Sequence, residues 1–166
     1  MASGDILATL SAWDGLPSIT LDSPQLKTIS GGDSELYYIA AFDDTTTEYL
    51  DFYSVMPNHY DGGGLTCTVI FTHANNSSGP SWYLGFRRMQ DDVDNMTSNH
   101  TYVYNSVAAT VPDTVGKIGY ADITFTDGAD MDSIATGEYF VSRIYRDVAT
   151  GGTGDANLLC VYIKET

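Results

Sequence analysis

The sequence predicts an all-β protein, an antiparallel β-sandwich of jelly-roll type with about eight strands, an N-terminal arm and one short helical turn. Val, Ile, Thr, Tyr and Phe are concentrated in short runs, which is typical of strands. Clusters of Gly, Asp, Asn and Ser separate these runs and favour turns, because Gly and Asn tolerate positive φ. At 166 residues, the chain has the length of one domain and can bury its own core.

The first element is the apolar segment Ile6–Trp13. Its apolar positions would form one stripe along a short helix: Ile6, Leu7, Leu10 and Trp13. Pro17 and Pro24 follow, so we expect residues 1–24 to form an arm and residues 25–166 to form the jelly-roll domain. The alternative is a first strand or helix that covers the protein's own core.

Eight later runs have the composition of strands. The clearest is Leu65–His73, where apolar residues alternate with residues that are mostly Thr, so one face would point to a core. The predicted core positions of this strand are Leu65, Cys67, Val69 and Phe71. The other runs are Leu36–Phe42, Tyr49–Val55, Ser81–Met89, Tyr102–Val111, Ile118–Phe125, Glu138–Tyr145 and Leu158–Lys164.

One segment between two of these strands, Asp127–Thr136, has helical character. Met131 and Ile134 are three residues apart, Asp127 is a candidate N-cap, and Gly137 would end the segment. We therefore expect one or two helical turns here.

The charge balance is strongly acidic, with 7 basic residues against 22 acidic ones and a net charge of −15. Such a chain repels phosphate backbones and anionic membrane surfaces, so we expect neither nucleic-acid nor membrane partners. The acidic residues either keep an exposed surface soluble or attract a specific basic partner. No apolar run is long enough for a signal peptide or a membrane span, so we expect the product to stay where it is made.

The residues that carry most catalytic and metal chemistry form no recognisable motif. His59, His73 and His100 lie far apart and offer no pair at metal-ligand spacing. The Asp-rich stretches 91–94 and 127–132 lack the spacing of a calcium loop, and capped turns are the better interpretation. No G-x-S-x-G nucleophile motif is present. We therefore predict no catalytic activity, no metal and no cofactor.

The cysteines and the aromatic residues are the side chains that decide between packing and contact. Cys67 and Cys160 both lie in apolar runs, so we expect two buried, reduced thiols rather than a disulfide. The chain has 12 Tyr and 2 Trp, more than a small core needs, and most of these rings are expected to be half-buried in strands. Trp82 is predicted to lie in the core, whereas Tyr60 is the candidate for an exposed contact.

Several stretches between residues 36 and 166 resemble small jelly-roll virion proteins of tailed phages, especially marine and freshwater ones. The resemblance lies in strand order, in the placement of Gly and Asp, and in the Glu-Thr ending. The stretches are DGGGLTCTVIFTH from Asp61, WYLGFRRM from Trp82, GKIGYADITF from Gly116, ATGEYFVSRIYRD from Ala135 and GTGDANLLCVYIKET from Gly152.

This resemblance implies a capsid cement or decoration protein, made in the host cytoplasm and bound to the capsid exterior of the virion as a homotrimer. Its partners would be further copies of itself and the major capsid protein. Candidate contacts between subunits or with the capsid are Ile6, Leu7, Leu10, Trp13 and Tyr60. The first alternative is a receptor- or carbohydrate-binding jelly-roll module of a tail fibre or baseplate, and the second is a hydrolase with an acidic pair.

Overall fold

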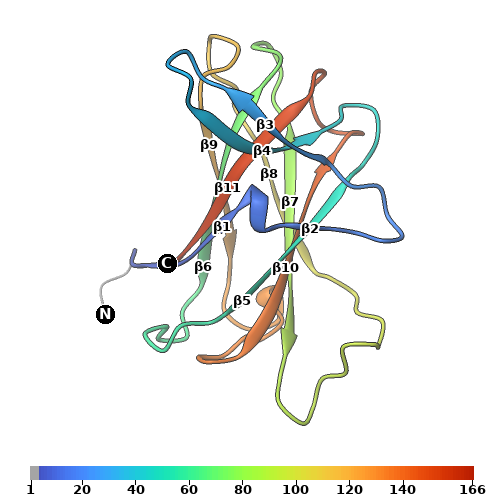
Figure 1. The fold of residues 1–166 in the computed structure, drawn as a ribbon. Coiled ribbons are helices and arrows are strands. Elements are labelled where there is room, and N and C mark those ends of the chain that lie inside the picture. Colours follow the sequence, from blue (N-terminus) through green and yellow to red (C-terminus); the bar gives the residue numbers. More distant parts are fainter. Residues whose placement is uncertain (1–3) are drawn as a thin grey trace.

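The computed structural model describes residues 4–166 and confirms the β-sandwich: two antiparallel sheets pack face to face (Figure 1). The six-stranded sheet contains β1 (Ile6–Ser11), β3 (Gln25–Ser30), β4 (Leu36–Phe42), β6 (Leu65–His73), β9 (Gly119–Phe125) and β11 (Ala156–Glu165). The five-stranded sheet contains β2 (Leu16–Pro17), β5 (Tyr49–Val55), β7 (Ser81–Met89), β8 (Tyr104–Ala108) and β10 (Tyr139–Asp147). Within the described residues these are eleven strands rather than eight.

The core lies between the two sheets and is bridged by aromatic rings. The predicted inward positions of β6 are all buried, as alternation along a strand requires. Trp82 on β7 is fully buried, as predicted, and its ring lies 5.1 Å from Phe42 and 6.0 Å from Phe71 on the opposite sheet. Phe86 and Phe125 make a similar edge-to-face contact across the sandwich at 4.9 Å.

The N-terminal segment is a strand that covers the core, which was the alternative to the helical arm. Residues 6–11 form strand β1, followed by the 3-10 helix η1 (Ala12–Asp14). β1 pairs with β11, and a register shift between Ile6 and Ala8 changes the phase of its alternation. Leu7 and Leu10, three residues apart, are therefore both buried in a strand, although that spacing is typical of a helix. The segment expected to form an arm thus supplies β1 to one sheet and β2 to the other.

β11 has two neighbours along the same edge. β4 pairs with Ala156–Leu158, β1 pairs with the later residues from Cys160, and β6 occupies the other edge throughout. The beginning of β4 therefore extends past β11 and is paired with β3 alone, forming a two-stranded hairpin that projects at the upper left of Figure 1.

The short helical turn expected after β9 is present. It is the 3-10 helix η2 (Ala129–Met131), with Gly128 at the N-cap position rather than Asp127. Met131 is buried and covers Tyr60, whose hydroxyl donates to the Gly63 carbonyl oxygen. Only 3% of Tyr60 is exposed, so the prediction of an exposed contact at this residue was wrong.

The two cysteines are both free. Cys67 is buried, but Cys160 is only half-buried, and each is paired across the β6–β11 ladder with an isoleucine rather than with the other. Among residues 4–166, no helix is long and apolar enough to cross a membrane.

Candidate binding cleft on the five-stranded sheet

The outer face of the five-stranded sheet carries an ordered set of aromatic and charged side chains. Because side chains alternate along strands, the odd-numbered residues of β5, β7 and β10 point away from the core. The antiparallel registers align them in four rows across β5, β10 and β7: Tyr49–Tyr145–Tyr83, Asp51–Arg143–Gly85, Tyr53–Val141–Arg87 and Val55–Tyr139–Met89.

The second row contains an ion pair. Arg143 Nε and Nη2 donate to the two carboxylate oxygens of Asp51 at 2.6 and 2.7 Å, and the side chains are 21% and 11% exposed. The guanidinium also lies 4.8 Å from the ring centroid of Tyr102. Hydrogen bonding to Asp51 raises the pKa of Arg143, so this pair is a fixed, charged part of the surface.

The first row forms a stack of tyrosines beside this pair. The rings of Tyr83 and Tyr145 are stacked at 4.8 Å, Tyr49 lies 5.1 Å from Tyr145, and Tyr104 meets Tyr145 edge-on at 5.0 Å. Burial raises the pKa of Tyr145 to about 12 and also raises that of Tyr104. These hydroxyls therefore stay protonated at neutral pH, and the stack supports one side of the ion pair.

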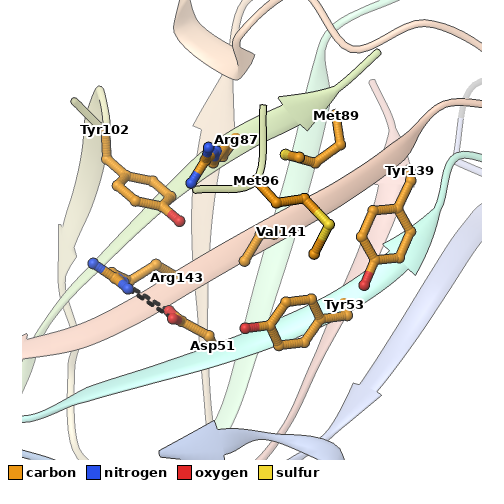
Figure 2. A pocket seen from close by; sticks show the side chains of 9 residues that line it. All are labelled: Asp51, Tyr53, Arg87, Met89, Met96, Tyr102, Tyr139, Val141 and Arg143. Atoms are coloured by element: carbon orange, nitrogen blue, oxygen red, sulfur yellow. Dashed lines mark hydrogen bonds and ion pairs between the residues drawn. The ribbon is translucent and has the colours of Figure 1, made fainter. Parts of the chain in front are cut away.

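A cleft of about 190 Å³ lies over the other rows (Figure 2). Its lining residues are Asp51, Tyr53, Arg87, Met89, Met96, Tyr102, Tyr139, Val141 and Arg143. Tyr53 and Tyr139 lie together at one end, with ring centroids 6.3 Å apart and planes inclined by 24°, and the Asp51–Arg143 pair lies at the other. The two tyrosines are 42% and 38% exposed. The cleft thus joins an accessible aromatic surface to a polar floor.

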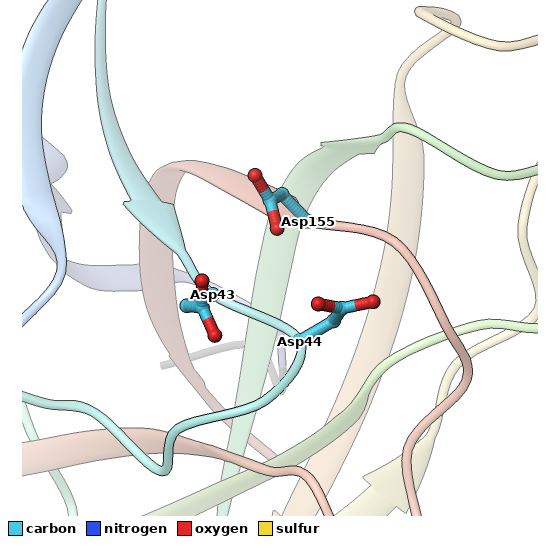
Figure 3. Close-up of side chains that lie close together, drawn as sticks. All are labelled: Asp43, Asp44 and Asp155. Carbon is cyan, nitrogen blue, oxygen red and sulfur yellow. The ribbon is translucent and has the colours of Figure 1, made fainter.

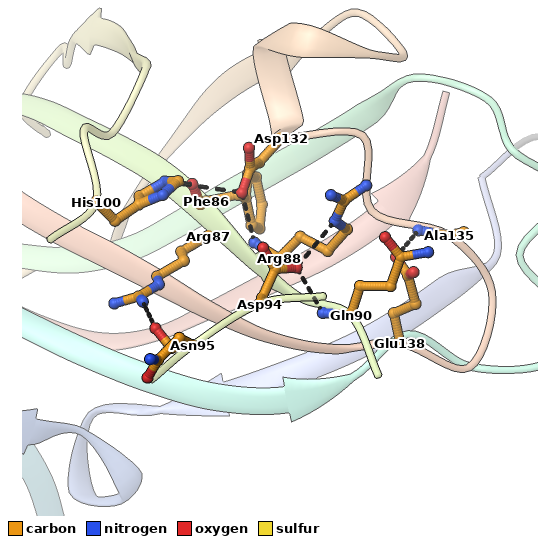
Figure 4. Close-up of polar contacts among 10 residues, drawn as sticks. All are labelled: Phe86, Arg87, Arg88, Gln90, Asp94, Asn95, His100, Asp132, Ala135 and Glu138. Carbon is orange, nitrogen blue, oxygen red and sulfur yellow. Dashed lines mark hydrogen bonds and ion pairs between the residues drawn. The ribbon is translucent and has the colours of Figure 1, made fainter. Parts of the chain in front are cut away.

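The loop between β7 and β8, residues 90–103, forms one wall of the cleft and is anchored to the sheet (Figure 4). Arg87 Nη2 donates to the carbonyl oxygens of Asn95 and Ser98 at 2.8 and 3.1 Å. Asp94 accepts from Gln90 N at 2.7 Å and pairs with Arg88 at 3.3 Å. These contacts place Met96 of the loop over the cleft.

Two further features hold the end of this loop that leads into β8 close to the sheet. His100 Nε2 lies 3.3 Å from the Phe86 carbonyl oxygen and 3.7 Å from a carboxylate oxygen of Asp132. At Gly85, an added Cβ would lie 2.8 Å from the Val103 carbonyl oxygen, so the absence of a side chain lets the loop approach the sheet.

A second hollow of about 490 Å³ adjoins the cleft. The two share Met89 and Tyr139, and the second is also lined by Gln90, Asp91, Gly137 and Glu138. A pocket that encloses a whole ligand measures roughly 300 to 1,000 Å³. The smaller cleft therefore fits part of a ligand, and the shared wall allows an extended ligand to occupy both.

None of the contact residues predicted from the sequence lines this cleft. Ile6 and Trp13 are exposed, and the Trp13 ring lies 4.5 Å from Tyr38, whereas Leu7 and Leu10 are buried in the core. The cleft was missed by sequence reasoning. A signal was available, because the outward positions of the predicted strands 49–55, 81–89 and 138–145 are rich in Tyr, Asp and Arg.

A separate acidic cluster lies at the start of the loop after β4 (Figure 3). Carboxylate oxygens of Asp43, Asp44 and Asp155 lie within 4.8 Å of one another. The hydroxyl and the backbone N–H of Thr45 both donate to Asp43 and lower its pKa, and Asp44 accepts from Gly154 N at 2.6 Å. Two of the three carboxylates, those of Asp43 and Asp44, therefore already have protein donors.

The two Asp-rich stretches singled out in the sequence act as turn caps, as predicted. Asp94 accepts from Gln90 N, and Asp130 accepts from the backbone and hydroxyl of Thr126 at 3.0 and 2.7 Å. The donors on Thr126 lower the pKa of Asp130. Both carboxylates stabilise loop structure.

Comparison with known proteins places only the fold. No family model and no curated protein matches the chain. Among solved structures, the CBM22-1 xylan-binding domain of Xyn10C from Paenibacillus barcinonensis aligns over 99% of this chain and 97% of its own, with a TM-score of 0.50 and 12% identity. The C-terminal CBM6 of LamC, a laminarinase from Zobellia galactanivorans, aligns over 95% and 98%, with a TM-score of 0.48 and 11% identity.

Proposed function

We propose that this chain is a carbohydrate-binding module whose ligand lies in the cleft on the five-stranded sheet. The observation that carries the proposal is the exposed Tyr53–Tyr139 pair beside a polar floor. A sugar ring presents C–H groups on its faces and hydroxyl groups around its edge. It therefore needs aromatic rings to stack on and fixed donors and acceptors alongside them, which this cleft combines.

The fold is compatible with this role. A xylan-binding domain has the same sandwich, and the chain aligns with nearly its whole length. At 12% identity the likeness concerns the fold, and a fold can serve many functions, so the cleft itself carries the proposal.

Binding is favoured over hydrolysis because of the state of Asp51. Glycoside hydrolysis uses two carboxyl groups about 5 to 9.5 Å apart, one of which donates a proton. Asp51, the carboxylate that lines the smaller cleft, accepts two hydrogen bonds from Arg143. Both oxygens of Asp51 are engaged by Arg143, and the described residues that line the smaller cleft include no second carboxyl group, so we propose that the cleft recognises its ligand without cleaving it.

The proposal is tested by measuring the affinity of oligosaccharides by isothermal titration calorimetry. The panel contains xylo-, manno-, cello- and laminari-oligosaccharides. An aromatic contact is worth about 0.5 to 1.5 kcal/mol, so Tyr53→Ala or Tyr139→Ala should weaken binding up to about tenfold. Tyr53→Phe should retain most of the affinity, because it keeps the ring.

The matched control is Tyr120→Ala. Tyr120 lies on β9 of the other sheet and is 62% exposed, so its loss should leave the affinity unchanged. Equal losses in Tyr120→Ala and Tyr53→Ala, or no binding to any member of the panel, would contradict the proposal.

A second candidate function, attachment to a capsid as a homotrimer, is favoured by a different surface. Leu36 and Tyr38, on one face at the beginning of β4, are 63% and 48% exposed, and the Tyr38 ring lies 4.5 Å from the exposed Trp13 ring. An apolar surface of this kind is typical of a protein contact. Quantitative mass spectrometry of purified virions would support this candidate if hundreds of copies were found, and absence from the particle would contradict it.

A further inference from the structure

We infer that the ligand is a glycan with a neutral backbone that carries isolated uronate residues, and that Arg87 binds the uronate carboxylate. This inference rests on the proposed function and names its substrate class. Three features of the cleft carry it: the unpaired charge of Arg87, the net charge of the cleft, and the acidic hollow beyond Tyr139.

Arg87 has donors to spare. A guanidinium has five N–H donors, and two of them go to the carbonyl oxygens of Asn95 and Ser98, which leaves three. Those two bonds also fix the side chain against the loop. Within residues 4–166, Arg87 makes no ion pair, whereas Arg88 pairs with Asp94 and Arg143 with Asp51. Arg87 is therefore a positioned cation that forms no ion pair within the described residues, although its charge also acts on the nearby Asp94 carboxylate.

The local charge of the cleft is opposite to that of the whole chain. Arg87 and Arg143 against Asp51 give +2 − 1 = +1 among the lining residues, although the chain carries −15. A neutral sugar over Arg87 would remove water from the guanidinium without matching its charge. A carboxylate replaces that water with a charge-assisted hydrogen bond, which is about twice as strong as a neutral one.

The second hollow limits how many carboxylates the ligand can carry. The second hollow, beyond Tyr139, is lined by Asp91 and Glu138. A uniformly charged polyanion that extends from the cleft into the second hollow would bring its carboxylates close to these acids, where like charges repel. The net charge of −15 opposes such a chain further. An isolated uronate at Arg87, with neutral rings on Tyr53 and Tyr139, keeps its charge away from these acids, and the net charge of the chain acts on one carboxylate rather than on many.

The test compares three ligands by calorimetry: xylotetraose, xylotetraose with one glucuronate branch, and a polygalacturonate oligomer. The branched ligand should bind about five- to tenfold more tightly than the unbranched one. The preference should shrink when NaCl is raised from about 0.05 to about 0.5 M, because salt screens the contact. The polygalacturonate oligomer should bind more weakly than the branched ligand.

Two variants of Arg87 are compared by one ratio, the affinity for the branched xylotetraose divided by the affinity for the unbranched one. In Arg87→Gln the ratio should fall to about one, and Arg87→Lys should retain part of it, because the charge remains. Thermal unfolding checks that both variants are folded. Lys27→Gln makes the same change in net charge at an exposed site on the other sheet, and its ratio should equal that of the wild type.

Four results would overturn the inference while leaving the proposed function in place. The first is equal wild-type affinity for the branched and unbranched ligands. The second is no affinity for the branched ligand while a neutral glycan binds. The third is polygalacturonate binding as tight as that of the branched ligand, and the fourth is an unchanged ratio in Arg87→Gln. Absence of binding to every glycan would overturn the proposed function as well.

Discussion

Replacing Asp51 with Asn should destabilise the protein, because it leaves the Arg143 guanidinium partly buried without its carboxylate. Exposed ion pairs contribute about 0.2 to 1 kcal/mol, and breaking a fully buried pair costs about 3 to 5 kcal/mol. With side chains 21% and 11% exposed, this pair lies between the two limits, and we expect a loss of about 2 kcal/mol. For a chain of this length, that loss lowers the unfolding temperature by about 4 to 8 °C.

The assay is urea unfolding at neutral pH for Asp51→Asn, Arg143→Gln and the double variant. A direct interaction predicts a coupling free energy of about 1 to 2 kcal/mol in the double-mutant cycle. The control is Asp113→Asn, which breaks a 2.7 Å pair with Lys117 whose side chains are 57% and 81% exposed, and which should cost under about 0.5 kcal/mol. Strictly additive losses, or equal losses at Asp51 and Asp113, would refute the reasoning.

Three further predictions follow from the same structure. Gly85→Ala should lower the free energy of unfolding by about 1 to 3 kcal/mol, because its Cβ would lie 2.9 Å from the Tyr104 ring. Gly32→Ala, whose Cβ would lie in open space, should leave the unfolding temperature unchanged. Burial raises the pKa of Tyr60 and Tyr145 to about 12, and unfolded tyrosine titrates near about 10. The free energy of unfolding should therefore be constant below about pH 10 and decrease between about pH 10 and pH 12. The tyrosinate absorbance of the folded protein should include a part that appears only at about pH 12. Ionisation of all tyrosines at about pH 10 would contradict this prediction. The unfolding temperature should rise with NaCl, since salt screens the self-repulsion of a chain of −15, and a flat response would show that the acids are compensated locally.

The fold was predictable wherever a run of apolar, aromatic and β-branched residues is bounded by turn residues. The bounds of β4, β5, β6 and β7 agree with the sequence prediction at both ends. For β1 the sequence left a strand and a helix open, because its register shift gives Leu7 and Leu10 the spacing of a helix. β3 was not predicted: its residues are exposed or half-buried at the edge of the sheet, so they lack an apolar alternation.

The cleft was less predictable, because it depends on which strands become neighbours. Alternation shows that Tyr53 and Tyr139 point outward, but only the order β5–β10–β7 brings these residues and Arg87 together. Tyr60 shows the opposite error. A tyrosine among glycines and polar residues suggests exposure. Tyr60 is nevertheless buried, and its hydroxyl contacts both the Gly63 carbonyl oxygen and the sulfur of Met131.

The most direct test of the cleft is an NMR titration of protein labelled with ¹³C at its methionine methyl groups. Met89 and Met96 line the cleft, whereas Met56 and Met131 are buried in the core and serve as internal references. On addition of a glycan that binds, we predict saturable shifts of the Met89 and Met96 signals and unchanged signals from Met56 and Met131. Saturable binding that leaves Met89 and Met96 unchanged would place the ligand elsewhere and contradict the account.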